Sequence, residues 1–149
     1  MPTTNDNTAT TWRDLADQLS ADERAAFEHL ENLAMPTAVL LDRARLEIEG
    51  RLVDIACADI PVPADATWVG KWEKNLKRDG YSRLLVWRES REPSMAVDID
   101  GDQQCDGTVT RYISAYLGDE PKFSSSQARK LAAMLVEAAD ALDAMGGAI

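Results

Sequence analysis

The fold of the C-terminal half is decided by residues 94–145, which read SMAVDIDGDQQCDGTVTRYISAYLGDEPKFSSSQARKLAAMLVEAADALDAM. Apolar and polar side chains alternate from Met95 to Asp102 and again from Val109 to Leu117, as they do in strands with one buried face. Asp106 and Gly107 lie between the two runs and favour a tight turn. The stretch therefore predicts a β-hairpin followed by a helix.

The register of this hairpin depends on the length of its loop. A two-residue Asp-Gly loop would place Asp100 opposite Ile113, on what should be the apolar face. A three-residue loop over residues 105–107, with Gly107 in the left-handed conformation, places Ile99 opposite Ile113 instead. Only the longer loop keeps one face apolar, so we predict the longer loop.

The last helix is expected to begin after Ser124, which forms a capping-box pattern with Gln127, and to stop at Gly146-Gly147. A third strand, from Tyr81 to Glu89, should precede the hairpin. The apolar stripe of the helix comprises Ala128, Leu131, Ala132, Leu135, Ala139, Leu142 and Met145. We expect this stripe to cover the apolar face of the hairpin, formed by Val97, Ile99, Ile113 and Ala115.

The other face of the hairpin carries three carboxylates, Asp98, Asp100 and Asp102. Their spacing follows the first positions of a calcium-binding loop. However, Gln103 stands where that loop needs glycine, and Val109 stands where it needs a bidentate glutamate. A strand also projects its side chains in a row and not around a point. We therefore interpret this face as a solvated acidic surface, and we expect no metal or cofactor.

The N-terminal half predicts about three helices. The first begins at Thr10 or Thr11, and the second follows Ser20, where a glutamate three residues later completes a capping box. The third extends from Ala38 to about Ala58 after the cap candidate Thr37, with an apolar stripe formed by Leu41, Ile48, Leu52 and Ile55. Two prolines within residues 59–63 end this helix and favour an extended linker.

Composition excludes several classes of protein. The chain has 149 residues and is 45% hydrophobic, which is typical of a small globular protein with a real core. No apolar run is long enough to span a membrane, and the first residues do not resemble a secretory signal. Cys57 and Cys105 lack C-x-x-C spacing, so we expect free thiols in a cytoplasmic protein and no zinc site.

The net charge of −10 is unevenly distributed. Residues 68–91 carry seven bases and three acids, and they lie between acidic segments at 1–67 and 92–149. The overall acid excess disfavours non-specific binding to nucleic acid or to an anionic membrane. The basic segment is also aromatic, as surfaces that stack bases and bind phosphates are. Its candidate binding residues are Trp68, Lys71, Trp72, Lys74, Lys77, Arg78, Arg83, Trp87 and Arg88.

Two other interpretations of the basic segment stay open. Trp68 and Trp72 are four residues apart, so they could form one apolar face while the lysines lie in water. The segment could also pair with the acidic helices of a second copy or of a protein partner.

Two parts of the chain resemble small uncharacterised proteins of actinobacteria and their phages. One is the opening TWRDLADQL at residues 11–19. The other is the C-terminal part, with the hairpin residues Val97, Ile99, Gly101, Gln103, Asp106, Gly107, Val109, Arg111 and Ile113 followed by SSSQARKLAAMLVEAADALD at residues 124–143. The resemblance leaves out residues 34–93. It implies an actinobacterial, phage or prophage origin and carries no activity.

These observations predict an α+β fold in which about three N-terminal helices precede a three-stranded antiparallel meander packed against a long C-terminal helix. The expected organisation is a disordered lead-in (1–10), a helical segment (11–60), a linker with the basic and aromatic residues (61–80), and the meander with its helix (81–149). We expect a cytoplasmic, non-enzymatic interaction or regulatory protein that self-associates or binds a protein partner, without a membrane. The alternative is a nucleic-acid-binding accessory protein that uses residues 68–91.

Overall fold

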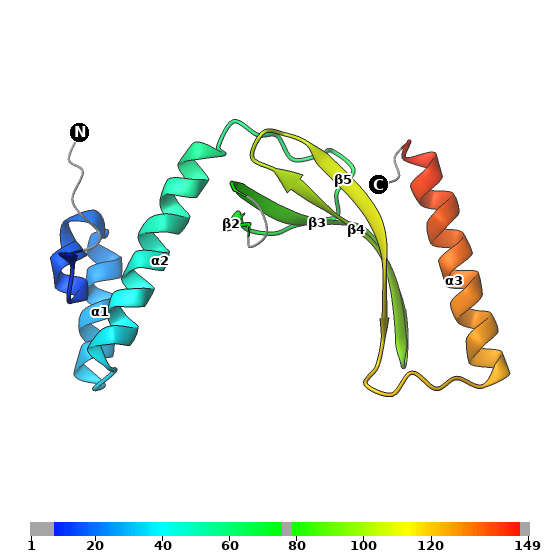
Figure 1. Cartoon of the computed structure of the whole chain (residues 1–149), viewed down its shortest axis with the longest axis horizontal. Helices are drawn as coiled ribbons and strands as arrows, with labels where there is room; N and C mark the ends of the chain where they lie inside the picture. Colours follow the sequence, from blue (N-terminus) through cyan, green and yellow to red (C-terminus); the bar gives the residue numbers. More distant parts are fainter. Residues whose placement is uncertain (1–7, 76–78, 147–149) are drawn as a thin grey trace. The chain divides into compact units, whose positions relative to one another are not determined.

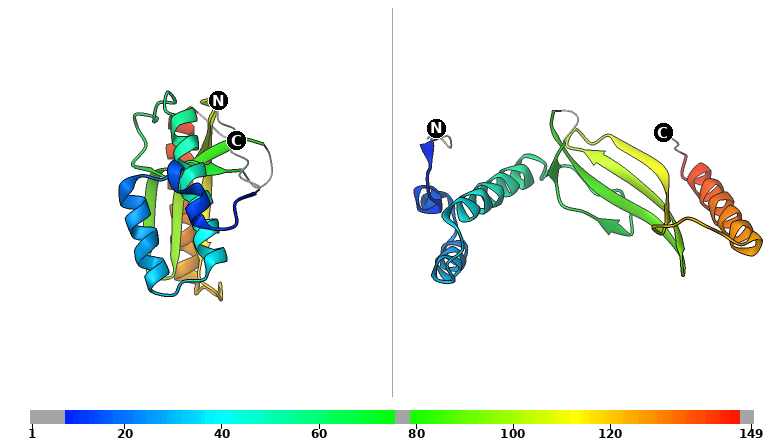
Figure 2. Two further views of the ribbon diagram at one scale, coloured as in Figure 1. Left: turned by 90° about the vertical axis from the view of Figure 1, so that its left-hand side faces the viewer. Right: turned by 60° about the horizontal axis from the view of Figure 1, so that its bottom comes forward.

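The computed structural model describes residues 8–75 and 79–146, and it has the predicted α+β composition. The chain divides into two compact units, one ending at Ile55 and the other beginning at Ala56. Figure 1 and Figure 2 show the elements of each unit. In chain order the described elements are η2 (Trp12–Gln18), α1 (Ala21–Asn32), α2 (Thr37–Ala56), β1 (Trp68–Val69), β2 (Glu73–Lys74), β3 (Tyr81–Glu92), β4 (Met95–Gln104), β5 (Val109–Leu117) and α3 (Ser125–Ala144).

The first unit contains three helices, as expected, but the first of them, η2, is a 3-10 helix. Asp14 caps the start of η2, because its carboxylate accepts hydrogen bonds from the backbone amides of Thr10 at 2.9 Å and Thr11 at 2.8 Å. The capping box at the start of α1 is confirmed: the Glu23 amide donates to the Ser20 hydroxyl, and the Ser20 amide donates to the Glu23 carboxylate. The core of this unit is formed by Trp12, Leu15, Leu19, Phe27, Leu40, Leu41, Ala44 and Ile48.

The predicted apolar stripe of α2 is only half right. Leu41 and Ile48 are buried, whereas Leu52 and Ile55 are 61% and 68% exposed. The four residues share one side of the helix, but the core of the first unit extends along α2 only as far as Ile48. Residues 8–10, which were expected to belong to a disordered lead-in, are described, and Ala9 packs against this core. Residues 1–7 of that lead-in lie outside the described part of the chain.

The second unit is built on an antiparallel sheet of five strands, not three. The predicted meander is present as β3, β4 and β5, and β1 and β2 add to the outer edge of β3. Both additional strands lie in the segment that was expected to be a linker. Each has two residues, which is too short to show the alternation by which a strand is recognised in a sequence.

The predicted hairpin register is confirmed. Ile99 lies opposite Ile113, and Gly107 has a φ of 91°, so the loop has three residues with a left-handed glycine. The Gln104 amide donates to the Thr108 carbonyl at 2.8 Å and closes the loop.

A β-bulge interrupts the pairing of β3 with β4. Val86 lies opposite Asp100 and Arg88 lies opposite Ile99, so Trp87 is an additional residue in β3. One inserted residue exchanges the two faces of the strand beyond it. Arg88 therefore lies on the side of Ile99, and Glu89 lies on the side of the aspartates.

Helix α3 packs on the apolar face of β4 and β5, as expected. Its predicted capping box is confirmed: the Ser124 backbone amide donates to Gln127 Oε1 at 2.9 Å, and the Gln127 backbone amide donates to the Ser124 hydroxyl. The predicted stripe is right in part: Leu142 is buried and Leu131 and Met145 pack against the core, but the buried face also contains Met134 and Ala138, which were not predicted. Ala128, Ala132 and Leu135 are exposed, and so is Ala115 of the sheet. Alanines occur on most sides of α3, so periodicity alone could not place its buried face. Gly147, half of the predicted stop, lies outside the described residues.

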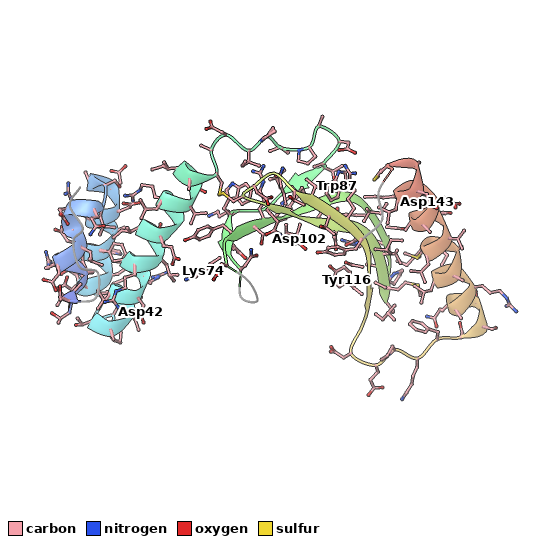
Figure 3. The ribbon with its side chains drawn as sticks, turned by 45° about the horizontal axis from the view of Figure 1, so that its top comes forward. Asp42, Lys74, Trp87, Asp102, Tyr116 and Asp143 are labelled. Carbon is pink, nitrogen blue, oxygen red and sulfur yellow. A yellow bond between two sulfur atoms is a disulfide. The ribbon has the colours of Figure 1, made fainter. Side chains whose placement is uncertain are left out.

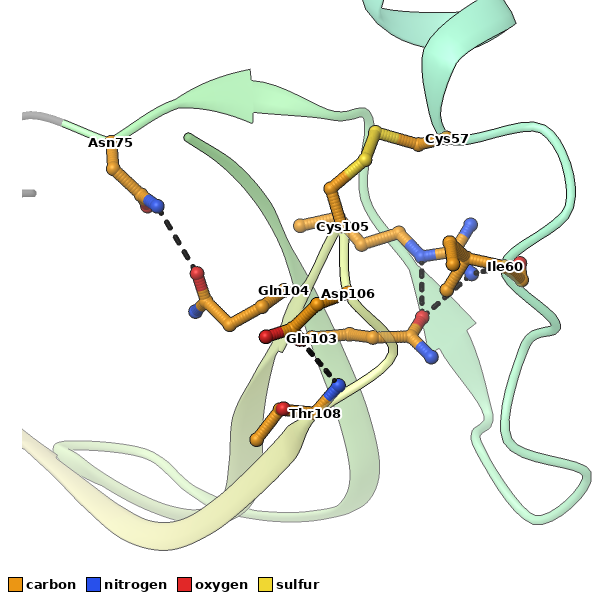
Figure 4. The surroundings of a disulfide bond; sticks show 9 residues. Cys57, Ile60, Asn75, Gln103, Gln104, Cys105, Asp106 and Thr108 are labelled. Carbon is orange, nitrogen blue, oxygen red and sulfur yellow. Dashed lines mark hydrogen bonds between the residues drawn. A yellow bond between two sulfur atoms is a disulfide. The ribbon is translucent and has the colours of Figure 1, made fainter. Parts of the chain in front are cut away.

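The expectation of free thiols is wrong. Cys57 and Cys105 form a disulfide with a Cα–Cα distance of 5.4 Å, as Figure 4 shows. The two residues are 48 positions apart, and the sequence contains nothing that predicts their proximity. The cytoplasmic location was inferred from free thiols, so the disulfide removes that support. No helix in the described part of the chain is long and apolar enough to cross a membrane.

Candidate functional site

The nine candidate binding residues of the basic segment do not form one surface. Trp68 in β1 is 53% exposed, and Lys71 and Lys74 are exposed. Trp87 is only 4% exposed, and its indole nitrogen donates to Asp65 at 3.1 Å. Lys74 and Trp87 are labelled in Figure 3. Lys77 and Arg78 lie outside the described residues.

Arg83 and Trp72 are brought together, but in a structural role. The Arg83 guanidinium lies 4.4 Å from the centre of the Trp72 ring and donates to the Gln103 amide oxygen at 2.7 and 2.8 Å. It also donates to the Ile60 carbonyl (Ile60 and Gln103 are labelled in Figure 4). Gln103 in turn donates to the Pro61 carbonyl at 2.9 Å. Burial lowers the pKa of Arg83. These contacts anchor the segment that follows Cys57 to the sheet.

Arg88 is also engaged. Its guanidinium pairs with the Glu137 carboxylate at 3.3 Å and donates to the Glu137 carbonyl at 3.2 Å. The bulge in β3 makes this contact possible, because it turns Arg88 to the face on which α3 lies. Of the nine candidates, only Trp68, Lys71 and Lys74 are therefore described as exposed.

The acidic face of the hairpin is not solvated, so that interpretation is wrong. Asp98 and Asp100 are 4% and 3% exposed. Arg91 binds the Asp98 carboxylate through both terminal nitrogens, and it also pairs with Glu89 at 2.8 Å. Because the bulge exchanges the faces of β3, it places Arg91 on the aspartate side. The bulge could not be predicted from the sequence, and without it Arg91 would lie on the opposite face.

Two tyrosines cover the remaining aspartates. The Tyr116 hydroxyl donates to Asp100 at 3.0 Å, and the Tyr112 hydroxyl donates to Asp102 at 3.2 Å; Asp102 and Tyr116 can be found in Figure 3. Burial, followed by the Asp102 charge, raises the pKa of Tyr112 to about 12. Each carboxylate thus has a donor within the sheet. The described residues contain no group of His, Cys, Asp or Glu arranged to hold a metal ion.

The sequence analysis overlooked the open edge of β5. The strand order ends at β5, so one side of this nine-residue strand pairs with no other described strand. The Gln104–Thr108 hydrogen bond and the alternation of an antiparallel ladder direct the even-numbered residues of β5 towards β4. The backbone N–H and C=O groups that face the open edge belong to Val109, Arg111, Ile113, Ala115 and Leu117.

This edge has little of the usual protection against pairing. Edge strands are commonly blocked by proline, by lysine, by a bulge or by a charged residue that points inward, and β5 contains no proline or lysine and pairs with β4 without a register shift. Its one protective feature is Arg111, which turns inward, where its guanidinium lies 4.7 Å from the centre of the Trp87 ring and donates to the Met145 carbonyl. A nine-residue alternating run without proline or lysine, last in a predicted meander, was the signal in the sequence.

One side of α3 adjoins this edge. Two ion pairs define the opposite side of the helix: Lys130 with Glu92 at 3.0 Å and Glu137 with Arg88 at 3.3 Å, both to β3. By helical geometry the side turned away from β3 carries Ala128, Ala132, Leu135 and Ala139, with Asp143 at its solvent edge. Leu135 is 36% exposed, and Val136, which is 60% exposed, points away from the sheet. We call Ala128, Ala132, Leu135 and Ala139 the α3 stripe; these four residues are uncharged and lie on the β5 side of the sheet.

The open edge of β5 and the α3 stripe form the candidate interaction surface of the second unit. Arg111 is the one charged residue of the β5 edge and the α3 stripe has none, in a chain whose net charge is −10. In comparisons with known proteins, the chain matches no protein-family model, no curated protein and no solved structure.

Proposed function

We propose that this chain is a non-enzymatic protein-interaction module with a regulatory role, and that it self-associates. The observation that carries the proposal is the open edge of β5. An unpaired strand edge binds an added strand through main-chain hydrogen bonds, and its alternating side chains provide specificity. An actinobacterial, phage or prophage origin, with a host or regulatory protein as a further partner, belongs to the same proposal.

Binding of nucleic acid by residues 68–91 is the alternative. It is supported by the exposed side chains of Trp68, Lys71 and Lys74. It is weakened by the engagement of Arg83 and Arg88 in contacts within the second unit.

The test is a pair of substitutions at Ala115, an exposed residue whose N–H faces the open edge. Ala115→Pro removes this donor without removing a hydrogen bond to β4, and its φ suits a strand, so the fold should persist while strand addition is blocked. Ala115→Val keeps the donor and serves as the matched control. Sedimentation velocity over a range of protein concentrations should show association of the wild type and Ala115→Val, and a monomer for Ala115→Pro.

Two results would contradict the proposal. A wild-type chain that stays monomeric at every concentration contradicts self-association. A salt-dependent shift of labelled DNA or RNA, lost when Lys71 and Lys74 are changed to alanine, would favour the alternative.

The proposed cytoplasmic location needs its own measurement, because disulfides persist mainly outside the reducing cytosol. Alkylation of thiols in whole cells, with and without prior reduction, reports whether Cys57 and Cys105 are bonded where the protein works. Free thiols would support the cytoplasm, and a retained disulfide would contradict it.

A further inference from the structure

We propose that a second copy of this chain occupies the candidate interaction surface, forming a two-fold dimer in which the two β5 strands pair antiparallel and the two α3 helices pack side by side. This inference rests on the proposed function and names its partner. A two-fold interface uses the same patch on both subunits, so the patch must be complementary to itself. The strand, the helix and their charges each meet this requirement.

Strand β5 is complementary to a second copy of itself through its backbone. Two β5 strands related by a two-fold axis at Ser114 would place Ile113 opposite Ala115 of the other copy, and Arg111 opposite Leu117. These are the odd-numbered residues whose N–H and C=O groups face the open edge, so each would exchange hydrogen bonds. Tyr112 would lie opposite Tyr116 of the other copy, a favourable aromatic pair on the opposite face.

Helix α3 is complementary to a second copy of itself through its charges. Arg129 and Asp143 lie seven residues before and after Val136, on the flank of the α3 stripe, and both are exposed. Neither makes an ion pair within the described part of the chain. In an antiparallel pair of helices centred on Val136, Arg129 of each copy lies beside Asp143 of the other.

The charges are also oriented against the helix dipole. The first turn of α3 contains no acid and the last turn contains no base. An isolated helix is stabilised by acids near its start and bases near its end. Acids near the end, such as Asp143, gain a favourable partner only when an antiparallel copy supplies one.

One two-fold axis serves both elements. The Lys130–Glu92 ion pair places Lys130, near the start of α3, level with Glu92 of β3. Glu92 lies opposite Met95 of β4, and Met95 lies opposite Leu117 of β5, so Lys130 and Leu117 are at the same level along the sheet. From that level, Ser114 is about 10 Å along β5 and Val136 is about 9 Å along α3. The proposed centres of the strand pair and of the helix pair therefore coincide.

The separation of the helices also fits. The core residues under α3 come from β3, β4 and β5, but the backbone of α3 lies close to those of β4 and β5 and not to that of β3, so the helix lies between β4 and β5. With strands about 4.8 Å apart, the α3 axis lies about 5 Å from the two-fold axis, and the two helices lie about 10 Å apart. Packed helices are separated by about 8–10 Å, and the alanines of the α3 stripe permit the close end of that range.

The test is a charge exchange between Arg129 and Asp143 (Asp143 is labelled in Figure 3). Arg129→Asp and Asp143→Arg each turn two attractive pairs per dimer into repulsive ones, so sedimentation equilibrium should show dimers weaker by roughly tenfold or more. The double variant restores the attraction and should restore the wild-type dissociation constant. Both single changes improve the match with the helix dipole, so a loss of folding cannot explain a weaker dimer.

A cross-link provides a second measurement. With Cys57 and Cys105 bonded to each other, Leu135→Cys has the only free thiol, and it lies on the side of α3 that would face the second copy, one residue from the proposed axis. Mild oxidation should convert it to a disulfide-linked dimer, whereas Ala133→Cys, exposed on another side of α3, should stay uncoupled.

The outcomes separate this inference from the proposed function. Association that is lost in Ala115→Pro, but is insensitive to Arg129→Asp and to Asp143→Arg, would overturn the two-fold arrangement and leave the β5 interaction standing. A wild-type monomer would overturn both. Single variants that weaken the dimer without recovery in the double variant would also overturn the Arg129–Asp143 pairing.

Discussion

Replacement of Gly101 by alanine is expected to destabilise the second unit severely. Gly101 lies in β4 between Leu85 of β3 and Arg111 of β5. A Cβ atom at this position would lie 2.1 Å from the Thr110 carbonyl oxygen and 2.7 Å from Cζ3 of Trp87. The Trp87 ring therefore occupies the space that a side chain at this position would need.

The magnitude follows from what would have to move. Insertion of a methyl group into a packed core costs about 1–3 kcal/mol when side chains can adjust. Here the closer atom is a backbone oxygen of β5, which can withdraw only if the ladder with β4 opens locally, and each lost hydrogen bond adds about 1 kcal/mol. We expect Gly101→Ala to lower the free energy of unfolding of this unit by about 3–5 kcal/mol, a large part of the stability of a typical domain.

The assay is urea unfolding followed by two-dimensional NMR at the amides of β4, which report on the second unit alone. Gly118→Ala is the matched control, because it lies in the same unit and a Cβ there meets no atom within 4 Å. Its unfolding free energy should stay near the wild-type value or rise by about 0.4–1 kcal/mol. A Gly101→Ala protein within about 1 kcal/mol of wild type would refute the steric argument.

Three further predictions concern other contacts of the second unit. Arg91→Leu should lower its unfolding free energy by about 2 kcal/mol, because Asp98 stays buried without its partner; the loss should shrink when Asp98→Ala is added. Cys57→Ser with Cys105→Ser should lower stability by about 4 kcal/mol in the chain-entropy estimate for a 48-residue separation, measured by urea unfolding. Because the pKa of Tyr112 is raised to about 12 in the folded protein, its neutral phenol should contribute to the unfolding free energy below pH 10, and this contribution should be lost as the pH rises towards 12. Tyr112→Phe should abolish this loss.

Each of these predictions has a result that would contradict it. An additive loss in the Arg91 and Asp98 double variant would show that the two side chains are not coupled. Equal unfolding curves for the oxidised protein and the double serine variant would show that the disulfide contributes nothing. Absorbance of the Tyr112 phenolate that rises near pH 10, by comparison with Tyr112→Phe, would show that its pKa is not raised.

Much of the fold could be predicted because its signals are local. The capping residues Ser20 and Ser124 act within one helical turn, so the starts of α1 and α3 were visible in the sequence. The hairpin register followed from alternation and from one left-handed glycine, Gly107, because a shift of one residue would turn every apolar side chain to the wrong face.

The candidate site was harder to predict, because it depends on relations between distant residues. The basic segment was expected to act as one surface, but Arg83 bonds to Gln103 of β4 and Trp87 donates to Asp65, so both have structural roles. The edge of β5 became a candidate only when the strand order showed that no described strand covers it.

The sequence by itself determined the helices, the three long strands and the pairing of Ile99 with Ile113, since each follows from spacing along a few neighbouring residues. The tertiary structure alone decided the disulfide between Cys57 and Cys105, the pairing of Arg91 with buried Asp98, and the addition of β1 and β2 to the edge of β3. The physical reason is the same for all three. They depend on which segments meet in space, and a single inserted residue at Trp87 was enough to change which side chains face each other.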